Sequence, residues 1–261
     1  SKLFFVDRGV TLDFASTIFG NLGTTVFTRF FRAAEKYFNT LLRAVSFRDD
    51  PERAKNQINT FVSRTTRGKI PELLKSAPDS QTLLMLVNAV YFNGNWKMPF
   101  DEQDTHSRPF YISEDETVEV PSLFNVMELP YYENAELGFQ LVGLPYDGEQ
   151  FTFYIILPKA QYVTGLMELE QKLTPQIIAD AVNGAEPFDW SFSMPKLDLE
   201  ERIDLKPVLE GLGICSLFNN NAALSRVAQS DLFISEAVHQ AKLIVNEKGT
   251  EAAAATFFTA T

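Results

Sequence analysis

The stretch that decides the fold reads Leu83-Leu84-Met85-Leu86-Val87-Asn88-Ala89-Val90-Tyr91-Phe92. It is almost continuously apolar, follows the polar Gln81 and ends at Asn93-Gly94. An apolar run of this length between polar and turn-forming residues predicts a central β-strand covered on both of its faces.

Other strands are expected on the C-terminal side of this run. The strand-like segments are residues 107–112, 117–129, 137–144, 151–157, 190–199 and 235–245. The turn sequence Tyr146-Asp147-Gly148-Glu149 lies between two of these segments, so residues 137–144 and 151–157 are predicted to form an antiparallel hairpin.

Helices are expected between the strands. Asp50 before Pro51 is a typical helix start, and the apolar stripe that follows ends near Gly68. Residues 10–42 also show apolar residues at helical spacing, and shorter helices are expected at 163–182 and 205–212. Helices and strands without strict alternation, and without a linker or repeat, predict the α+β class, and the length allows one large domain or two small ones.

Composition excludes several classes of function. The 261 residues carry a net charge of −11, which argues against a nucleic-acid binder. The most basic stretch, residues 64–69, is interpreted as a solvated helix end. No run of about 18 apolar residues occurs, so no membrane span is expected. The one cysteine, Cys215, lies in an apolar run and is expected to be a buried structural thiol.

An enzyme is not expected. The chain has two histidines, His106 and His239, and lacks a Gly-x-Ser-x-Gly elbow, a glycine-rich phosphate loop and His or Cys pairs at metal-binding spacing. His239 falls on an apolar strand face, which favours a hydrogen-bonded core histidine. Neither a cofactor nor a metal is predicted.

The tail is unusual, because a strong strand is followed by a glycine, four alanines and small polar residues. It reads Asn246-Glu247-Lys248-Gly249-Thr250-Glu251-Ala252-Ala253-Ala254-Ala255-Thr256-Phe257-Phe258-Thr259-Ala260-Thr261. Small side chains allow a segment to slip between neighbouring strands. Taken alone, the tail is interpreted more readily as a frayed or tag-like C-terminus.

Residues 233–256, which contain the start of this tail, resemble the hinge region of the serpins. Three further motifs match that family in order: Ile58–Val62 with Gly68–Ile70, Asn88–Trp96 with Pro99-Phe100 and Thr105, and Met194–Leu197. The chain departs from the family's usual pattern at Phe61, where tryptophan is usual, and at Lys248, where a second glutamate is common. Its general appearance is similar to arthropod haemolymph serpins.

The resemblance implies a serpin fold, with a large mixed central β-sheet, two smaller sheets and surrounding helices. Residues 1–261 would form one incomplete serpin domain that lacks N-terminal helices and C-terminal strands. Residues 246–261 would be the hinge and the first part of the reactive-centre loop. Residues 10–27 look like an apolar insertion to which no role can be assigned.

The function implied is irreversible inhibition of a serine protease. In this family the protease cleaves the loop, forms a covalent acyl-enzyme, and is distorted when the loop enters the main sheet as a new strand. The implied protein is a secreted monomer, with the cytoplasm as the alternative location, and its weakly implied target is a clip-type immune protease. The alternative function is a non-inhibitory serpin that acts as a hormone carrier or chaperone.

The resemblance also assigns site residues. The reactive-loop hinge is Glu247, Gly249, Thr250, Glu251, Ala252, Ala253, Ala254, Ala255 and Thr256. Asn88 and His239 form a gate pair where the sheet opens, and Trp96, Lys196 and Glu247 form a cluster at the top of the sheet. Gly249 is expected to supply unusual backbone angles, and Thr250 to become buried on insertion. The scissile bond would lie beyond Thr261.

Overall fold

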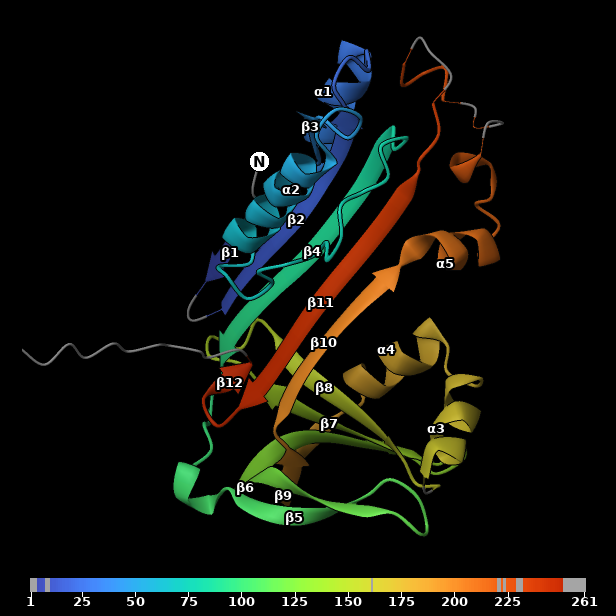
Figure 1. The fold of residues 1–261 in the computed structure, drawn as a ribbon. Coiled ribbons are helices and arrows are strands. Elements are labelled where there is room, and N and C mark those ends of the chain that lie inside the picture. The colour runs from blue at the N-terminus through green and yellow to red at the C-terminus, as the bar shows by residue number, and fades with distance from the viewer. Residues whose placement is uncertain are drawn as a thin grey trace, which may run out of the picture. The chain divides into compact units, whose positions relative to one another are not determined.

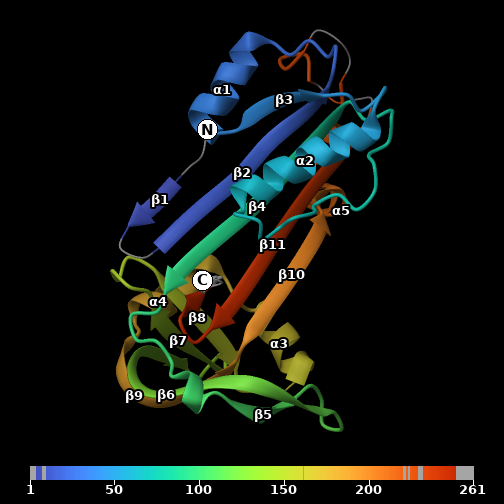
Figure 2. The same ribbon diagram turned by 60° about the vertical axis from the view of Figure 1, so that its left-hand side comes forward.

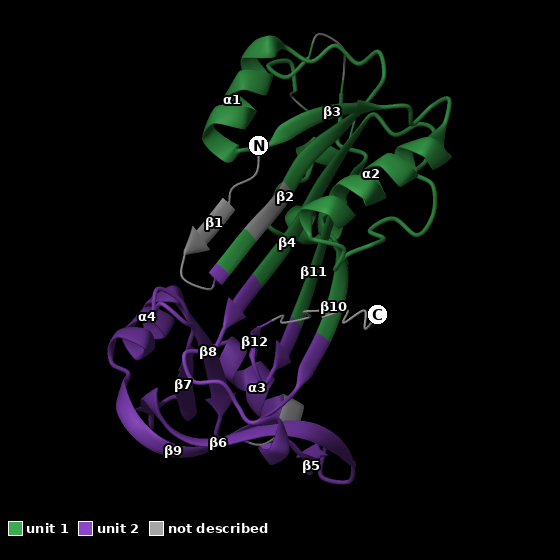
Figure 3. Ribbon diagram, turned by 90° about the vertical axis from the view of Figure 1, so that its left-hand side faces the viewer, with its two compact units in different colours: residues 1–6, 11–92, 199–243 green, residues 7–10, 93–198, 244–261 purple. Residues whose placement is uncertain are grey.

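The computed structural model describes residues 4–7, 10–160, 162–219, 222, 224–228 and 232–250 (Figure 1). The chain divides into two compact units, coloured separately in Figure 3. The first comprises residues 1–6, 11–92 and 199–243, and the second comprises residues 7–10, 93–198 and 244–261.

A seven-stranded sheet contains the predicted central strand. Its order is β1 (Phe4–Asp7), β2 (Val10–Asn21), β4 (Leu84–Asn95), β12 (Gly249–Thr250), β11 (Glu236–Asn246) and β10 (Leu197–Asp204), and β3 (Leu41–Val45) pairs with β2. β4 carries the apolar run 84–92 and lies inside the sheet, as predicted. β4 and β11 also pair directly and in parallel, with residues 85–90 opposite residues 236–241.

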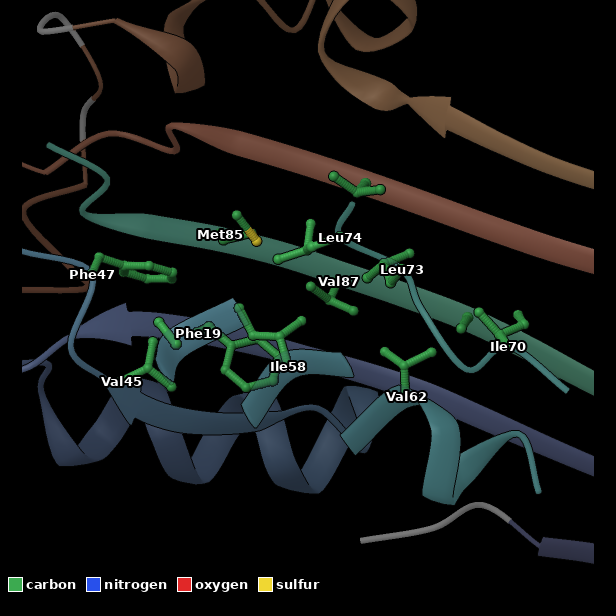
Figure 4. Packing of buried hydrophobic residues seen from close by; sticks show 13 residues of the cluster. Phe19, Val45, Phe47, Ile58, Val62, Ile70, Leu73, Leu74, Met85 and Val87 are labelled. Atoms are coloured by element: carbon green, nitrogen blue, oxygen red, sulfur yellow. The ribbon is translucent and has the colours of Figure 1, made fainter. Parts of the chain in front are cut away.

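Helix α2 (Pro51–Thr65) covers part of this sheet in the first unit (Figure 2). It begins as the sequence predicts, because the Asp50 side chain accepts a hydrogen bond from the Arg53 backbone N–H and Pro51 occupies the first turn. Its apolar stripe packs with strand residues into one buried cluster (Figure 4). The fully buried helix members of that cluster are Ala54, Ile58 and Val62.

The remaining helical segments of the first unit are short. They are α1 (Thr28–Phe38), α5 (Leu205–Gly211) and the 3-10 turn η2 (Ser216–Phe218). Among the helices described, α2 is the longest with 15 residues, and none combines the length and apolar character that a membrane crossing needs.

The second unit contains a five-stranded antiparallel sheet. Its strands are β5 (His106–Tyr111), β6 (Thr117–Asn134), β7 (Phe139–Pro145), β8 (Thr152–Pro158) and β9 (Glu186–Pro195). β7 and β8 form the predicted antiparallel hairpin. The helices of this unit are the turn η1 (Glu102–Asp104), α3 (Tyr162–Glu170) and α4 (Pro175–Asn183), and residues of α3 and α4 pack with Phe139 and Leu141.

Two expectations for the N-terminal part are wrong. Residues 10–21 form strand β2 rather than a helix, and they pair in parallel with β3 from Thr17↔Leu41 to Asn21↔Val45. These residues are therefore part of the large sheet and not an insertion of unknown role. The helical spacing seen in the sequence belongs to α1 alone, whereas the β-branched and aromatic residues of 10–21 favour a strand.

The expectation for Cys215 is also wrong, because its thiol is exposed. Cys215 precedes the turn η2 and donates a hydrogen bond to the Glu210 carbonyl at 3.5 Å. Phe218, at the end of that turn, takes the buried position instead. An apolar run near a turn thus places only some of its members in the core.

Candidate functional site

The start of the predicted hinge is a strand of the large sheet. Gly249 and Thr250 form β12, which is antiparallel to β11 on one side and to β4 on the other. Thr250 lies opposite Val245 of β11 and Gly94 of β4. At this point the sheet therefore holds an extra strand between β4 and β11.

Gly249 is required by space rather than by backbone angle. Its φ is not among the positive values recorded for other glycines, which corrects the sequence-based expectation. A Cβ built on Gly249 would lie 1.9 Å from the Gly94 carbonyl oxygen and 2.8 Å from the Asn95 Cα. Only a residue without a side chain lets the hinge approach the β4 backbone this closely.

Thr250 is already buried, with 2% of its surface exposed. Its hydroxyl is hydrogen-bonded to the hydroxyl of Tyr146, which is itself buried. Burial raises the pKa of Tyr146 to about 12, although the hydrogen bond with Thr250 acts in the opposite direction. Tyr146 thus stays neutral and gives the one polar atom of the Thr250 side chain a partner.

Trp96 fixes the backbone that leads into the hinge. Its indole Nε1 donates to the Asn246 carbonyl at 2.9 Å, and its backbone N–H donates to the Lys248 carbonyl at 2.9 Å. The ring stacks on Tyr146, with 4.7 Å between centroids and an interplanar angle of 17°. Trp96 therefore links the turn 246–248 to the residue that contacts Thr250.

Glu247 is held at several atoms. Lys196 Nζ lies 2.8 Å from Oε1 and 2.9 Å from Oε2, and the Thr105 hydroxyl donates to Oε1 at 2.9 Å. Burial alone would raise the pKa of Glu247, but the hydrogen bonds from Lys196, the backbone and Thr105, with the charge of Lys196, together lower it. Since the Glu247 side chain is only 8% exposed, this pair is not an ordinary surface salt bridge.

The gate pair lies in the first unit, where β4 and β11 pair directly. His239 is opposite Asn88 in the ladder, and its Nδ1 lies 2.9 Å from Asn88 Oδ1. Asn88 Nδ2 in turn donates to the Ser16 hydroxyl of β2 at 2.8 Å. With the amide in this orientation, Nδ1 carries a proton, and one chain of hydrogen bonds joins three strands.

The predicted site residues thus fall into two groups. Asn88 and His239 contact each other in the first unit, whereas Trp96, Lys196, Glu247, Gly249 and Thr250 come together in the second. The predicted hinge residues Glu251, Ala252, Ala253, Ala254, Ala255 and Thr256 lie outside the described residues, as does the predicted scissile bond beyond Thr261.

Three contact residues were not assigned from the sequence. The sequence places Tyr146 in a turn and Thr105 in a motif, but it assigns neither of them a role. Ser16 lies in the segment that was read as helical. Tyr146 directly follows an apolar strand segment, and this position indicates that its side chain is buried. A buried tyrosine needs a hydrogen-bond partner for its hydroxyl.

Comparison with known proteins gives one family. The model of the family "Serpin (serine protease inhibitor)" matches residues 2–261. A leukocyte elastase inhibitor of Xenopus tropicalis is 36% identical over 249 residues, which are 94% of this chain and 66% of that protein. Iripin-8 of Ixodes ricinus is 36% identical, with coverage of 95% and 61%, and antitrypsin of Bombyx mori is 34% identical, with coverage of 97% and 65%.

Solved structures give the same fold. Thyroxine-binding globulin in complex with thyroxine superimposes with a TM-score of 0.87 at 25% identity, over 96% of this chain and 67% of that one. Uncleaved ovalbumin superimposes with a TM-score of 0.86 at 26% identity, over 94% and 66%. The chain spans about two thirds of the length of these relatives. The fold is the expected serpin fold, and the chain belongs to the serpin family.

Proposed function

We propose that the full-length protein is an irreversible suicide-substrate inhibitor of a serine protease. The protease serine attacks the carbonyl of the bond beyond Thr261, the amide bond breaks, and the new amine takes the proton and leaves. The loop stays attached to the protease as an ester. Entry of the loop into the large sheet then carries the protease away from the geometry that it needs for deacylation.

One observation carries this proposal: β12 already lies between β4 and β11. A strand that is antiparallel to both neighbours can form ladder hydrogen bonds on both sides. Residues after Thr250 would extend β12 along the same two strands. To do so they must replace the direct parallel ladder between residues 85–90 and 236–241.

The composition of the hinge supports the same mechanism. Alternate residues from Thr250 onward, including Ala252 and Ala254, would face the interior on the register inferred from the sequence. Small uncharged side chains there need little room and leave no charge unpaired in the core. These alanines lie outside the described residues, so their place in the inserted strand is a proposal.

The two groups of contacts have different proposed roles. Asn88 and His239 join β4 to β11, so their hydrogen bond must break when the loop advances. Trp96, Lys196 and Glu247 hold the turn from which the loop departs. We therefore propose that the first group controls opening and that the second group holds the hinge at its starting position.

A non-inhibitory carrier is the second candidate function. It is favoured by the likeness to thyroxine-binding globulin, which was solved in complex with thyroxine. The relatives named as inhibitors of elastase and as antitrypsin are closer in sequence and favour inhibition. A secreted monomer that restrains a clip-type immune protease is a further proposal, and it rests on the general resemblance to arthropod serpins.

The test is to mix the full-length protein with a trypsin-like, a chymotrypsin-like and an elastase-like protease and to look for an SDS-resistant complex. Thr250→Arg should convert the inhibitor into a substrate, because a guanidinium would replace a buried hydroxyl beside Tyr146. Thr250→Ser keeps the hydroxyl and serves as the control. Undiminished complex with Thr250→Arg contradicts the insertion mechanism, and absence of complex with every protease favours the carrier.

A further inference from the structure

A cavity of about 630 Å³ lies in the first unit between helix α2 and strands β2 and β3. Its volume falls within the range of roughly 300–1,000 Å³ that is typical of small-molecule sites. It shares no residue with the hinge or with the gate pair, although Ser16, which accepts a hydrogen bond from Asn88, also lines it. Its lining consists of an apolar floor and a polar wall.

The floor is aromatic and aliphatic. Phe19 of β2 is almost fully buried, and Phe61 of α2 meets it edge to face with 5.8 Å between ring centroids. Val45 of β3, also buried, completes the floor. An apolar ring or chain of a ligand would find dispersion contacts here on several sides.

The wall is one stripe of α2. Arg53, Asn56, Gln57, Thr60 and Arg64 line the cavity and are exposed. Positions 53, 56 or 57, 60 and 64 follow one another at intervals of three or four residues, so these side chains lie on one helix face. Each carries at least one side-chain hydrogen-bond donor, and the two guanidinium groups carry only donors.

A third guanidinium comes from strand β3. Arg43 of β3 lines the same cavity, and its Cζ lies 4.7 Å from the centre of the Phe61 ring. None of the lining residues is Asp or Glu. Within the described part of the chain, Arg43, Arg53 and Arg64 form no ion pair with a carboxylate.

This concentration of unneutralised positive charge contrasts with the chain as a whole. The chain carries 34 acidic and 23 basic side chains, yet three arginines surround one apolar hollow without a counter-charge among its lining residues. Arginine is suited to binding an acid beside an aromatic ring, because its planar group forms paired hydrogen bonds with carboxylates and also stacks on aromatic rings.

We propose that this cavity is a binding site for a small amphipathic carboxylate, whose apolar body lies on Phe19 and Phe61 and whose acid group is bound by Arg53 and Arg64 with Arg43. The shared chemistry fits a medium-chain fatty acid and an aromatic acid alike. The site requires neither loop cleavage nor loop insertion, so it goes beyond the proposed inhibition of a protease.

The experiment measures binding to the full-length protein by isothermal titration calorimetry, with octanoate and 2-naphthoate as the two probes. Octanol and 2-naphthol, which lack the carboxylate, are their uncharged partners. We expect saturable binding of one acid molecule per chain and much weaker binding of the alcohols. The acid that binds with the higher affinity indicates whether the natural ligand has an aliphatic chain or an aromatic ring.

Two variants locate the site. The double variant Arg53→Gln/Arg64→Gln should weaken binding of the acid by roughly tenfold, since it removes two charged contacts at a solvent-accessible rim. The control Arg32→Gln/Arg48→Gln makes the same change of net charge at exposed arginines that do not line the cavity. Thr60→Trp places a bulky side chain in the cavity without changing charge and should also weaken binding.

The proposal is overturned by any of three results: no saturable binding of either acid, equal affinity for acids and alcohols, or equal weakening by the two arginine double variants. All of the substituted residues are exposed, so the variants are expected to fold. Melting curves of the ligand-free variants verify this before titration.

Discussion

Strands β4 and β11 behave differently in their two halves. Over residues 85–90 and 236–241 they pair directly in a parallel ladder, and Asn88 and His239 add a side-chain hydrogen bond. Near Asn95 and Asn246 they are separated by β12, and Trp96, Lys196 and Tyr146 contact the segment 246–250. The sheet is closed in the first region and occupied by the hinge in the second.

On the proposed mechanism, this difference is what a sheet would show when it holds a strand that has only begun to enter. In the occupied region, the hinge contributes a residue without a side chain and a small hydroxyl residue with a buried partner. In the closed region, separation would cost a ladder and a hydrogen-bonded pair. We infer that the closed region resists further insertion until cleavage releases the loop, a state of kinetic rather than thermodynamic stability.

Gly249→Ala should have the largest effect, because it breaks the occupied region. The new Cβ would overlap the backbone of Gly94 and Asn95, so β12 must leave the sheet or β4 must shift. We expect a loss of about 3 kcal/mol in unfolding free energy, at the upper end of overpacking effects. Hydrogen exchange should show faster exchange at Thr250, with little change at residues 85–90.

Gly211→Ala is the matched control for that variant. Gly211 ends α5, has no atom within 4 Å of an added Cβ and shows no positive φ. It should be neutral or slightly stabilising, since alanine has the higher helix propensity. Similar losses in both variants would mean that close packing at Gly249 is not the reason for the glycine.

His239→Ala should have the next largest effect and acts on the closed region. It leaves Asn88 Oδ1 without its partner in a half-buried ladder, at a cost of about 1–3 kcal/mol. We also expect faster formation of loop–sheet polymer under mild heat, followed on native gels. A double-mutant cycle with Asn88→Ala should give a coupling energy above about 0.5 kcal/mol. Additive effects, or unchanged polymerisation, would remove the gating role.

The pH dependence of Glu247 should be the smallest effect and tests the occupied region. The folded pKa of Glu247 is lowered from 4.5, so its contribution to stability is present above pH 4.5 and is lost as the pH falls through the lower folded value. The melting temperatures of wild type and Glu247→Gln should differ at neutral pH, by the equivalent of about 1 kcal/mol, and converge as the pH falls below the folded pKa of Glu247. A difference in melting temperature that grows on acidification would mean that the pKa of Glu247 is not lowered in the folded protein.

The sequence was sufficient for much of the fold because local signals agreed with the packing. The run 84–92 is apolar on both faces and lies inside a sheet, and Asp50-Pro51 begins the helix that the motif predicts. The prediction for residues 10–21 is wrong because it groups them with α1, which has true helical spacing, although Gly20 and Gly23 interrupt the stretch. Their strand pairing depends on residues far along the chain, which periodicity does not show.

The site was predictable to the extent that it consists of motif positions. The contact between Asn88 and His239 and the pair Lys196–Glu247 follow from those positions. The role of Gly249 was anticipated for the wrong reason, because a close approach to the β4 backbone leaves no trace in local sequence. The Tyr146 hydroxyl meets Thr250 across 104 residues of chain, which the sequence alone does not reveal.

The most direct test of the central claim compares the melting temperature of the intact full-length protein with that of the protein cleaved in its loop. If the cleaved loop extends β12 between β4 and β11, the cleaved form gains a central strand. It should then melt more than about 10 °C above the intact form. Equal melting temperatures would contradict loop insertion and leave β12 as a fixed part of the sheet.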